Sequence, residues 1–303
     1  GNGIGICGNN GTDVLIMKNG SNLTMEDNGT AGIFLWGGKV KVEAGNTLTI
    51  TGTGKDIKEI TDSRYDGALA VYYYYNTYTA DVNFEDGATV NLIDNDVSAI
   101  NNDGKVYIGN GTTIMNNGSK TVYGGGIQNR GDITIAPNVK LYNNHAKVAG
   151  DDIYNTTGTS ANGLTSYTGS ITFAPVGDGW ILDNCSDPIV GWYHDGKEKR
   201  WNGDGEGDAY YADEYTVSEE AVSDALALKA AHGQLCSVTY EVTGDIPSDA
   251  GAVPAAAKVK KGGSYTVAPV QTTSQSRYTF SGWRINGVGD VVTEIKDIQQ
   301  DVK

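Results

Sequence analysis

A short unit of alternating apolar and polar residues, most complete in residues 125–144, recurs along the first two thirds of the chain. In this unit Ile133 and Ile135 alternate with polar residues, and Val139 and Leu141 do so after a Pro-Asn turn. Period-two spacing bounded by Gly, Pro and Asn predicts short β-strands joined by tight corners. Three strands this short bury an apolar face only when copies of the unit stack above and below them.

Copies of the central strand recur with a base period of about 25 residues, interrupted by two insertions. The aligned pairs are Val14/Ile16, Val40/Val42, Val82/Phe84, Val106/Ile108, Ile133/Ile135 and Ile171/Phe173. A preceding strand is aligned at Gly32-Ile33, Ala70-Val71, Ala99-Ile100, Gly126-Ile127 and Asp152-Ile153. The following strands end in polar pairs, which are Asp27-Asn28, Asp94-Asn95, Asn116-Asn117, Asn143-Asn144 and Asp183-Asn184. The pattern predicts an all-β fold over residues 1–190, a right-handed, three-faced parallel β-helix of about six coils, with corner asparagines stacked into ladders.

Two segments break the period. The first, about residues 55–78, contains a run of tyrosines, and the second, about residues 156–169, is rich in Thr, Ser and Gly and is expected to be a plain loop. Residues 191–234 are expected to cap the open end of the β-helix, because an uncovered sheet edge invites unwanted pairing. Within the cap, Ser218 as N-cap and Gly233 as C-cap predict one helix. The aromatic residues expected in the core of the cap are Trp180, Trp192, Tyr193 and Trp201.

From residue 235 to residue 303, alternation over several segments predicts a separate, small β-rich module. It contains Val238-Thr239-Tyr240-x-Val242-x-Gly244, Gly263-x-x-Tyr265-Thr266-Val267 and the block Tyr278-Thr279-Phe280-Ser281-Gly282-Trp283. These blocks resemble the SHIRT-type repeat and the Listeria–Bacteroides (internalin-B-type) repeats of Gram-positive surface proteins. The GGGIQN run at residues 124–129 and the Asn-Asn corners resemble the β-helix regions of bacterial surface adhesins and autotransporter-like proteins. The resemblance implies a spacer module next to an adhesin-type β-helix, on the cell surface or attached to the cell wall.

Composition and net charge disfavour some classes of binding partner. The 303 residues include 42 Gly and 6 Pro and carry a net charge of −15, which disfavours nucleic acids and anionic membranes. The sequence has no run of 18 apolar residues, so no membrane-spanning helix is predicted. The three cysteines, Cys7, Cys185 and Cys236, do not have the spacing of a metal site. The sequence allows either a disulfide between Cys185 and Cys236 or reduced thiols. The start GNGIGI has neither an initiator Met nor a signal peptide, so we expect a piece of a longer protein, monomeric in isolation.

Two motifs allow both a functional and a structural interpretation. Asp151-Asp152 is similar to the paired aspartates of pectin-degrading hydrolases, but the Gly-His-Gly and Arg-x-Lys partners of those enzymes are missing. The structural alternative places the pair at a corner aligned with Gly124-Gly125. Arg130-Gly131-Asp132 spells an integrin-recognition tripeptide, yet it aligns with two-residue corners that do not project.

An acidic loop has the spacing of a calcium-binding loop. Its candidate ligands are Asn202, Asp204, Glu206, Asp208 and Asp213, with Gly207 at the sixth position. Hard oxygen ligands at alternate positions suit Ca²⁺. The alternative is a solvated acidic loop, since the first position is Asn and the last is Asp.

The tyrosine run is the strongest candidate for ligand binding. Consecutive strand residues face opposite sides, so about two tyrosines in residues 72–75 must face outward. The candidate platform comprises Trp36, Tyr65, Tyr72, Tyr73, Tyr74, Tyr75 and Tyr78. Aromatic surfaces suit sugars and protein interfaces, although the same rings could pack the insertion onto the flank. We therefore expect an extracellular adhesin that binds a host glycan or extracellular protein through its flank. A polysaccharide lyase or hydrolase and a structural stalk are the alternatives.

Overall fold

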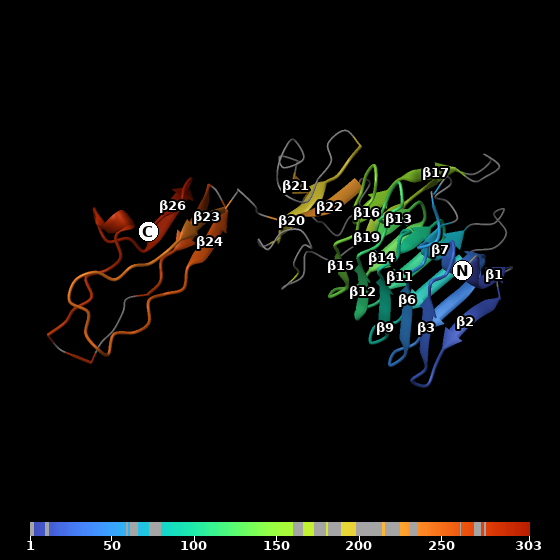
Figure 1. The fold of residues 1–303 in the computed structure, drawn as a ribbon, viewed down its shortest axis with the longest axis horizontal. Helices are drawn as coiled ribbons and strands as arrows, with labels where there is room; N and C mark the ends of the chain where they lie inside the picture. The colour runs from blue at the N-terminus through green and yellow to red at the C-terminus, as the bar shows by residue number, and fades with distance from the viewer. Residues whose placement is uncertain are drawn as a thin grey trace. The chain divides into compact units, whose positions relative to one another are not determined.

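The chain folds into two compact units, Gly1–Ala230 and Ala231–Lys303 (Figure 1). The structure, a computed structural model, describes residues 3–9, 12–58, 60, 66–72, 80–159, 166–172, 180, 189–197, 214–215, 225–230, 235–260, 262–269, 274–275 and 277–303. Among these residues, no helix is long and apolar enough to cross a membrane.

Unit 1 is a three-faced parallel β-helix, as the sequence predicts, and successive coils add their strands to the same three sheets (Figure 1). Sheet 1 stacks β1 (Ile4–Asn9), β4 (Ala31–Trp36), β7 (Gly67–Tyr72), β10 (Ile100–Asn102), β13 (Ile127–Asn129) and β16 (Ile153–Asn155). Sheet 2 stacks β2 (Asp13–Met17), β5 (Gly38–Val42), β8 (Ala80–Phe84), β11 (Lys105–Ile108), β14 (Asp132–Ile135) and β19 (Ser170–Thr172). Sheet 3 stacks β3 (Asn22–Glu26), β6 (Thr47–Thr51), β9 (Thr89–Ile93), β12 (Thr112–Met115) and β15 (Lys140–Tyr142).

The register of these strands places like residues over like residues inside the coil. In sheet 2, Val106 pairs with Val82 on one side and with Ile133 on the other. Because β-strand side chains alternate, each strand sends every second side chain into the core. The largest fully buried side chains are Phe84, Ile33, Leu35, Leu48, Ile50, Leu69, Leu92, Ile100, Ile108, Ile114 and Trp192. The in-register aliphatic stack is the main stabilising feature of unit 1.

Two of the strand alignments predicted from the sequence are wrong by one or two residues. In β2 the residues opposite Val40 and Val42 are Leu15 and Met17, not Val14 and Ile16, because the register shifts between Asp13 and Leu15. In sheet 1 the residue opposite Ile33 and Ile100 is Leu69, two positions before the predicted Val71. The β-bulge in β2 adds one residue and reverses the sides of those that follow, which spacing alone does not reveal. The two-residue difference in β7 involves no bulge and keeps each side chain on its expected side.

Buried asparagines form the predicted ladder at the corner between sheets 3 and 1. The side-chain amide of Asn95 donates to Oδ1 of Asn117, and Asn117 donates in the same way to Asn144, each at 2.9 Å. The ladder ends on Asp152, whose Oδ1 accepts from Asn144 at 2.9 Å. The residues before the three ladder asparagines have positive φ angles, 55° at Asp94, 56° at Asn116 and 56° at Asn143. Asn and Asp tolerate this left-handed conformation better than other side chains, which explains the repeated polar pair.

A second ladder follows the corner between sheets 1 and 2. Asn102 donates to Oδ1 of Asn129 at 2.8 Å, and Asn129 donates to Oδ1 of Asn155 at 2.7 Å. Asn102 and Asn129 also accept from the backbone N–H two residues on, Gly104 at 2.8 Å and Gly131 at 3.2 Å. Each asparagine therefore closes its own corner and joins it to the next coil.

The C-terminal end of unit 1 is capped by strands. β22 (Ala225–Ala230) pairs antiparallel with β16, and β20 (Ile189–His194) and β21 (Glu214–Tyr215) follow in the same sheet. The helix predicted between Ser218 and Gly233 is therefore wrong over Ala225–Ala230, because the free edge of β16 supplies backbone partners that outweigh local helix propensity. Trp192 of β20 is 2% exposed and packs in the main core, as expected for a cap residue. The second insertion is not a plain loop, because β17 (Thr157–Thr159) and β18 (Ser166–Thr168) form a hairpin.

Unit 2 contains two antiparallel pairs. β23 (Leu235–Val238) pairs with β24 (Ala257–Lys260), and β25 (Gly263–Thr266) pairs with β26 (Glu294–Ile298). A short 3₁₀ turn, η2 (Ile285–Gly287), follows the Trp-containing block. Its small core contains Cys236, Val238, Val259 and Ile298. Cys236 is a buried free thiol and Cys7 an exposed one, while Cys185 lies outside the described residues.

Candidate functional site

The described part of the predicted aromatic platform lies on the outer side of sheet 1. Trp36 ends β4 and Tyr72 ends β7, and the two residues are register partners with ring centroids 6.2 Å apart. The ring centroid of Phe34 lies 5.9 Å from that of Trp36, and Phe34 completes the cluster. Phe34 and Tyr72 are 6% and 8% exposed, whereas Trp36 is half-buried. Tyr65, Tyr73, Tyr74, Tyr75 and Tyr78 lie outside the described residues.

The aromatic cluster interrupts the repeat of the coils. The outward position held by Phe34 in β4 is held by Ala70 in β7, Asn101 in β10 and Gln128 in β13. Both faces of β4 are apolar, since Ile33 and Leu35 point into the main core while Phe34 belongs to a separate cluster outside it. A strand with two apolar faces departs from the usual alternation of one apolar and one polar face, so the outer side of sheet 1 at β4 differs from that of the later coils.

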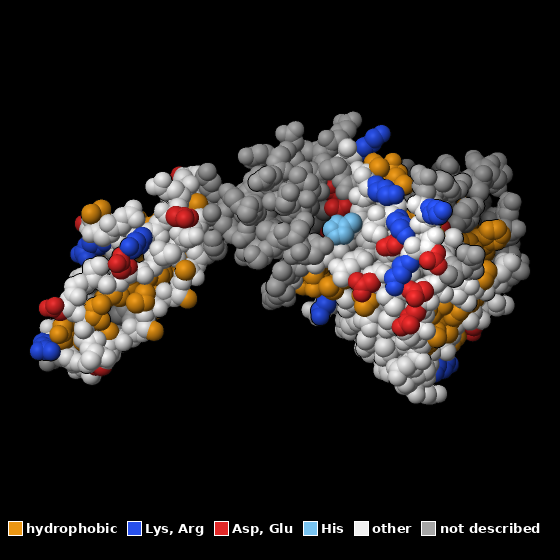
Figure 2. Space-filling view, viewed as in Figure 1, with side chains coloured by type: hydrophobic (Ala, Val, Ile, Leu, Met, Phe, Trp, Pro, Cys, Tyr) orange, Lys and Arg blue, Asp and Glu red, His pale blue; other side chains and the backbone are white. Residues whose placement is uncertain are grey.

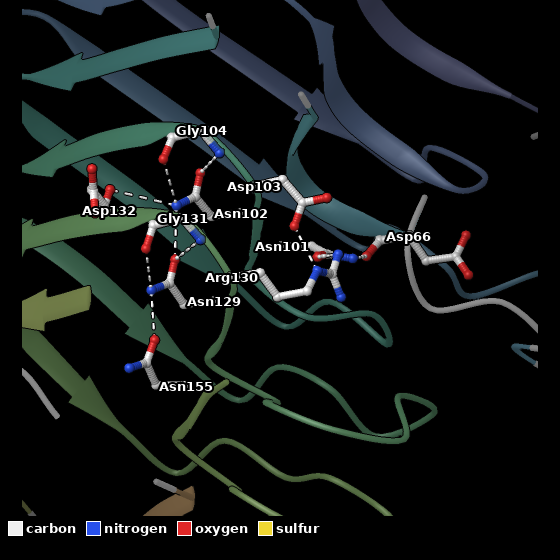
Figure 3. A network of polar contacts seen from close by, with 10 residues as sticks. All are labelled: Asp66, Asn101, Asn102, Asp103, Gly104, Asn129, Arg130, Gly131, Asp132 and Asn155. Atoms are coloured by element: carbon white, nitrogen blue, oxygen red, sulfur yellow. Dashed lines mark hydrogen bonds and ion pairs between the residues drawn. The ribbon is translucent and has the colours of Figure 1, made fainter. Parts of the chain in front are cut away.

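The Arg-Gly-Asp tripeptide is part of a corner network and does not project (Figure 3). The Nε of Arg130 donates to Oδ1 of Asp103 at 2.5 Å, and Nη2 of Arg130 donates to Oδ1 of Asn101 at 3.2 Å. The side chains of Arg130 and Asp103 are 12% and 2% exposed. Asp132 accepts from the hydroxyl of Ser170 at 2.6 Å. This geometry favours a structural role in joining adjacent coils over integrin recognition.

The paired aspartates are also engaged in coil corners. Oδ1 of Asp151 accepts from the backbone N–H of Ala146 at 2.8 Å, and Asp152 ends the asparagine ladder. The backbone N–H of Asp151 donates to Oδ2 of the fully buried Asp195, which follows β20, at 2.7 Å. The register aligns Asp151 and Asp152 with residues 125 and 126, one position from the predicted alignment. The two carboxylates therefore satisfy backbone donors where the cap meets the last coil.

The predicted calcium ligands Asn202, Asp204, Glu206, Asp208 and Asp213 lie outside the described residues. Within the described part of the chain, no group of three or more His, Cys, Asp or Glu side chains is placed to hold a metal ion. The calcium site thus stays a prediction.

Unit 2 contains a cavity of about 560 Å³ near its Trp-containing block. Tyr240, Phe280 and Trp283 line it, and the rings of the first two meet Trp283 edge-on at 4.7 and 4.8 Å. The hydroxyl of Tyr240 accepts from the backbone N–H of Ala268 at 2.9 Å and donates to the hydroxyl of Tyr265 at 3.3 Å. This hydrogen bond, followed by burial, raises the pKa of Tyr265. The ring contacts show how the Tyr-Thr-Phe-Ser-Gly-Trp block contributes to the packing of the module.

A further surface, which the sequence prediction missed, is the outer face of sheet 3. Its outward residues form in-register rows, first Asn22, Thr47 and Thr89, then Thr24, Thr49, Asn91, Thr113 and Lys140, and then Glu26, Thr51, Ile93, Met115 and Tyr142. The signal is visible as Thr47-x-Thr49-x-Thr51, but alternating threonines are also typical of any exposed strand.

Comparison of the chain with protein-family models, with curated proteins and with solved structures found no match.

Proposed function

We propose that this chain belongs to an extracellular, adhesin-like protein of a bacterial surface, and that one flank of its β-helix binds a glycan or a host protein. The architecture supports the proposal, because a stack of in-register coils presents long, rigid outer faces. The surface-repeat resemblance of residues 235–303 supports a cell-surface or cell-wall location in a Gram-positive bacterium. The net charge of −15 disfavours a nucleic acid as the partner.

The observation that carries the proposal is the cluster of Phe34, Trp36 and Tyr72 on the outer side of sheet 1. Later coils place Asn101 and Gln128 on this face, so the aromatic rings are not required by the coil itself. Trp36 is the most exposed of the three rings and lies next to the end of β7, from which the tyrosine run continues. Large, rigid aromatic side chains are enriched where proteins bind sugars and other proteins.

The test is binding of the whole chain to a glycan array and to an array of host extracellular proteins. We expect saturable binding to at least one ligand, and a loss of about fivefold or more in affinity for Trp36→Ala. Tyr107→Ala is the matched control, because Tyr107 is a half-buried aromatic residue on the outer face of sheet 2. Absence of binding on both arrays would favour a structural stalk, and turnover on a polysaccharide panel would favour an enzyme.

A further inference from the structure

The outer face of sheet 3 combines two kinds of row that run from coil to coil. The hydroxyl row is Thr24, Thr49, Asn91, Thr113 and Lys140. The second row begins with Glu26 and Thr51 and continues with Ile93, Met115 and Tyr142, which make it an apolar row over the last three coils. Within the hydroxyl row, Nδ2 of Asn91 donates to the hydroxyl of Thr49 at 3.2 Å. The apolar row ends in an aromatic pair, since Trp180 stacks on Tyr142 with ring centroids 5.0 Å apart and an interplanar angle of 18°.

This face carries little charge on an acidic chain. Among the outward residues of its five strands, charge is carried by Glu26 on the first strand and Lys140 on the last. On sheet 2, by contrast, one outward row alternates acids and bases, in the order Asp13, Lys39, Asp81, Lys105 and Asp132. Figure 2 shows acidic and basic side chains gathered in a band on unit 1, next to a surface that is largely free of charge. An exposed face normally carries mixed charges for solubility, so the low number of charges on sheet 3 needs a reason.

The two rows match the two kinds of group that a sugar presents. Threonine hydroxyls and the asparagine amide donate and accept hydrogen bonds, as sugar hydroxyls require. Ile93, Met115 and the stacked Tyr142 offer apolar contact to the C–H faces of sugar rings. The rows repeat every coil, at about 4.8 Å, so a regular polymer lying along the β-helix would meet the same pair of groups at each step.

Other occupants fit this face less well. An extended peptide binds a sheet mainly through backbone groups at a strand edge, whereas this face offers side chains of paired strands. A nucleic acid requires clustered basic side chains, and an anionic polysaccharide is repelled by a chain of net charge −15. We infer that the outer face of sheet 3 binds an extended, uncharged polysaccharide lying along the stack of coils. The inference does not depend on the proposed site at Trp36, which is on sheet 1.

The test is affinity electrophoresis of the whole chain through gels that contain one soluble polysaccharide each. Galactomannan, xyloglucan, mixed-linkage β-glucan and α-mannan serve as uncharged probes, and polygalacturonate and hyaluronate as anionic ones. We expect retardation by at least one uncharged probe and by neither anionic probe. Tyr142→Ala removes one ring of the aromatic pair at the end of the apolar row and should weaken binding about fivefold or more.

Thr113→Glu keeps the result interpretable if the loss of Tyr142 disturbs folding, because it adds charge to the hydroxyl row at a half-buried, outward position. It should also weaken binding about fivefold or more. The matched controls on sheet 2, Thr134→Glu and Tyr107→Ala, should bind within about twofold of the unchanged chain. Three results would each overturn the inference. The first is that no uncharged probe retards the chain, and the second is that the control variants weaken binding as much as the sheet 3 variants do. The third is that binding is lost with Trp36→Ala and kept with both sheet 3 variants.

Discussion

Sheets 2 and 3 rest on the same core but present different chemistry to the outside. Inside, Val82 and Val106 of sheet 2 and Val90 and Leu92 of sheet 3 are in one continuous apolar cluster. Outside, sheet 2 alternates acidic and basic residues along its stack, and sheet 3 carries threonine and apolar rows. The coil repeat therefore constrains the inward positions and the corners, whereas the outward positions are free to carry function.

The largest effect is expected from breaking the support that both faces share. Asn117 is fully buried and donates to the carbonyl oxygens of Leu92 and Met115 at 2.8 Å each, in addition to its two ladder bonds. Asn117→Ala leaves these buried carbonyls and amides unsatisfied and should lower the free energy of unfolding by about 4 kcal/mol. Denaturant unfolding followed by circular dichroism measures the change.

The matched control is Asn116→Gly, one residue earlier. Asn116 is exposed and has a φ of 56°, which glycine adopts without strain. It should change the free energy of unfolding by about 0.5 kcal/mol or less. Equal effects of the two variants would contradict the assignment of the ladder as the shared support.

Much of this shared support could be predicted from the sequence, because coil-to-coil pairing repeats the same residue type. The period of Val40, Val82, Val106 and Ile133 predicted the strands of sheet 2 and their pairing, and the Asn-Asn pairs predicted the ladders. The shift at β2 escaped prediction because a bulge is a backbone event with no residue signature there.

The cap and the outer faces were harder to predict, for two physical reasons. The residues around Ala225–Ala230 favour a helix locally, and the tertiary pairing with β16 that overrides this preference lies about 70 residues away in sequence. The outer face of sheet 3 was not predicted as a binding surface, because Thr47, Thr49 and Thr51 are typical of any exposed strand. Its significance comes from the register of five coils, which places threonine, asparagine and apolar residues into rows.

A smaller effect is expected at the corner that leads into sheet 2. Arg130→Ala leaves the buried carboxylate of Asp103 without its guanidinium partner and should lower the free energy of unfolding by about 3 kcal/mol. Lys105→Ala, an exposed basic position on the outer face of sheet 2, is the control and should cost about 0.5 kcal/mol or less. Thermal and denaturant unfolding of both variants measure the difference. A cost of Arg130→Ala no larger than that of Lys105→Ala would show that the pair does not join the coils.

The smallest effect is expected from the surface charges that distinguish sheet 2 from sheet 3. Nζ of Lys41 lies 2.7 Å from Oε1 of Glu85, and the backbone N–H of Ala44 donates to Oε2 of Glu85 at 3.2 Å. The hydrogen bond from Lys41, followed by that from Ala44, lowers the pKa of Glu85 below its ordinary value of 4.5. A lowered pKa means that the folded state prefers the ionised form. The stabilisation is therefore complete above pH 4.5 and is lost as the pH falls through the lower, folded-state value.

Glu85→Gln removes this stabilisation and leaves the outer face of sheet 3 unchanged. We expect the variant to unfold at a slightly lower denaturant concentration than the unchanged chain at pH 7, and the difference to disappear at pH values below the folded-state pKa. Because the pair is exposed to solvent, 1 M salt should reduce the difference at pH 7 as well. Thr134→Ala, an uncharged outward change on the same sheet, should show no such dependence on pH or salt. If the variant and the unchanged chain still differ in their unfolding midpoint at low pH, Glu85 stabilises the fold through packing rather than through charge. The surface charges of sheet 2 would then make no contribution to the free energy of unfolding.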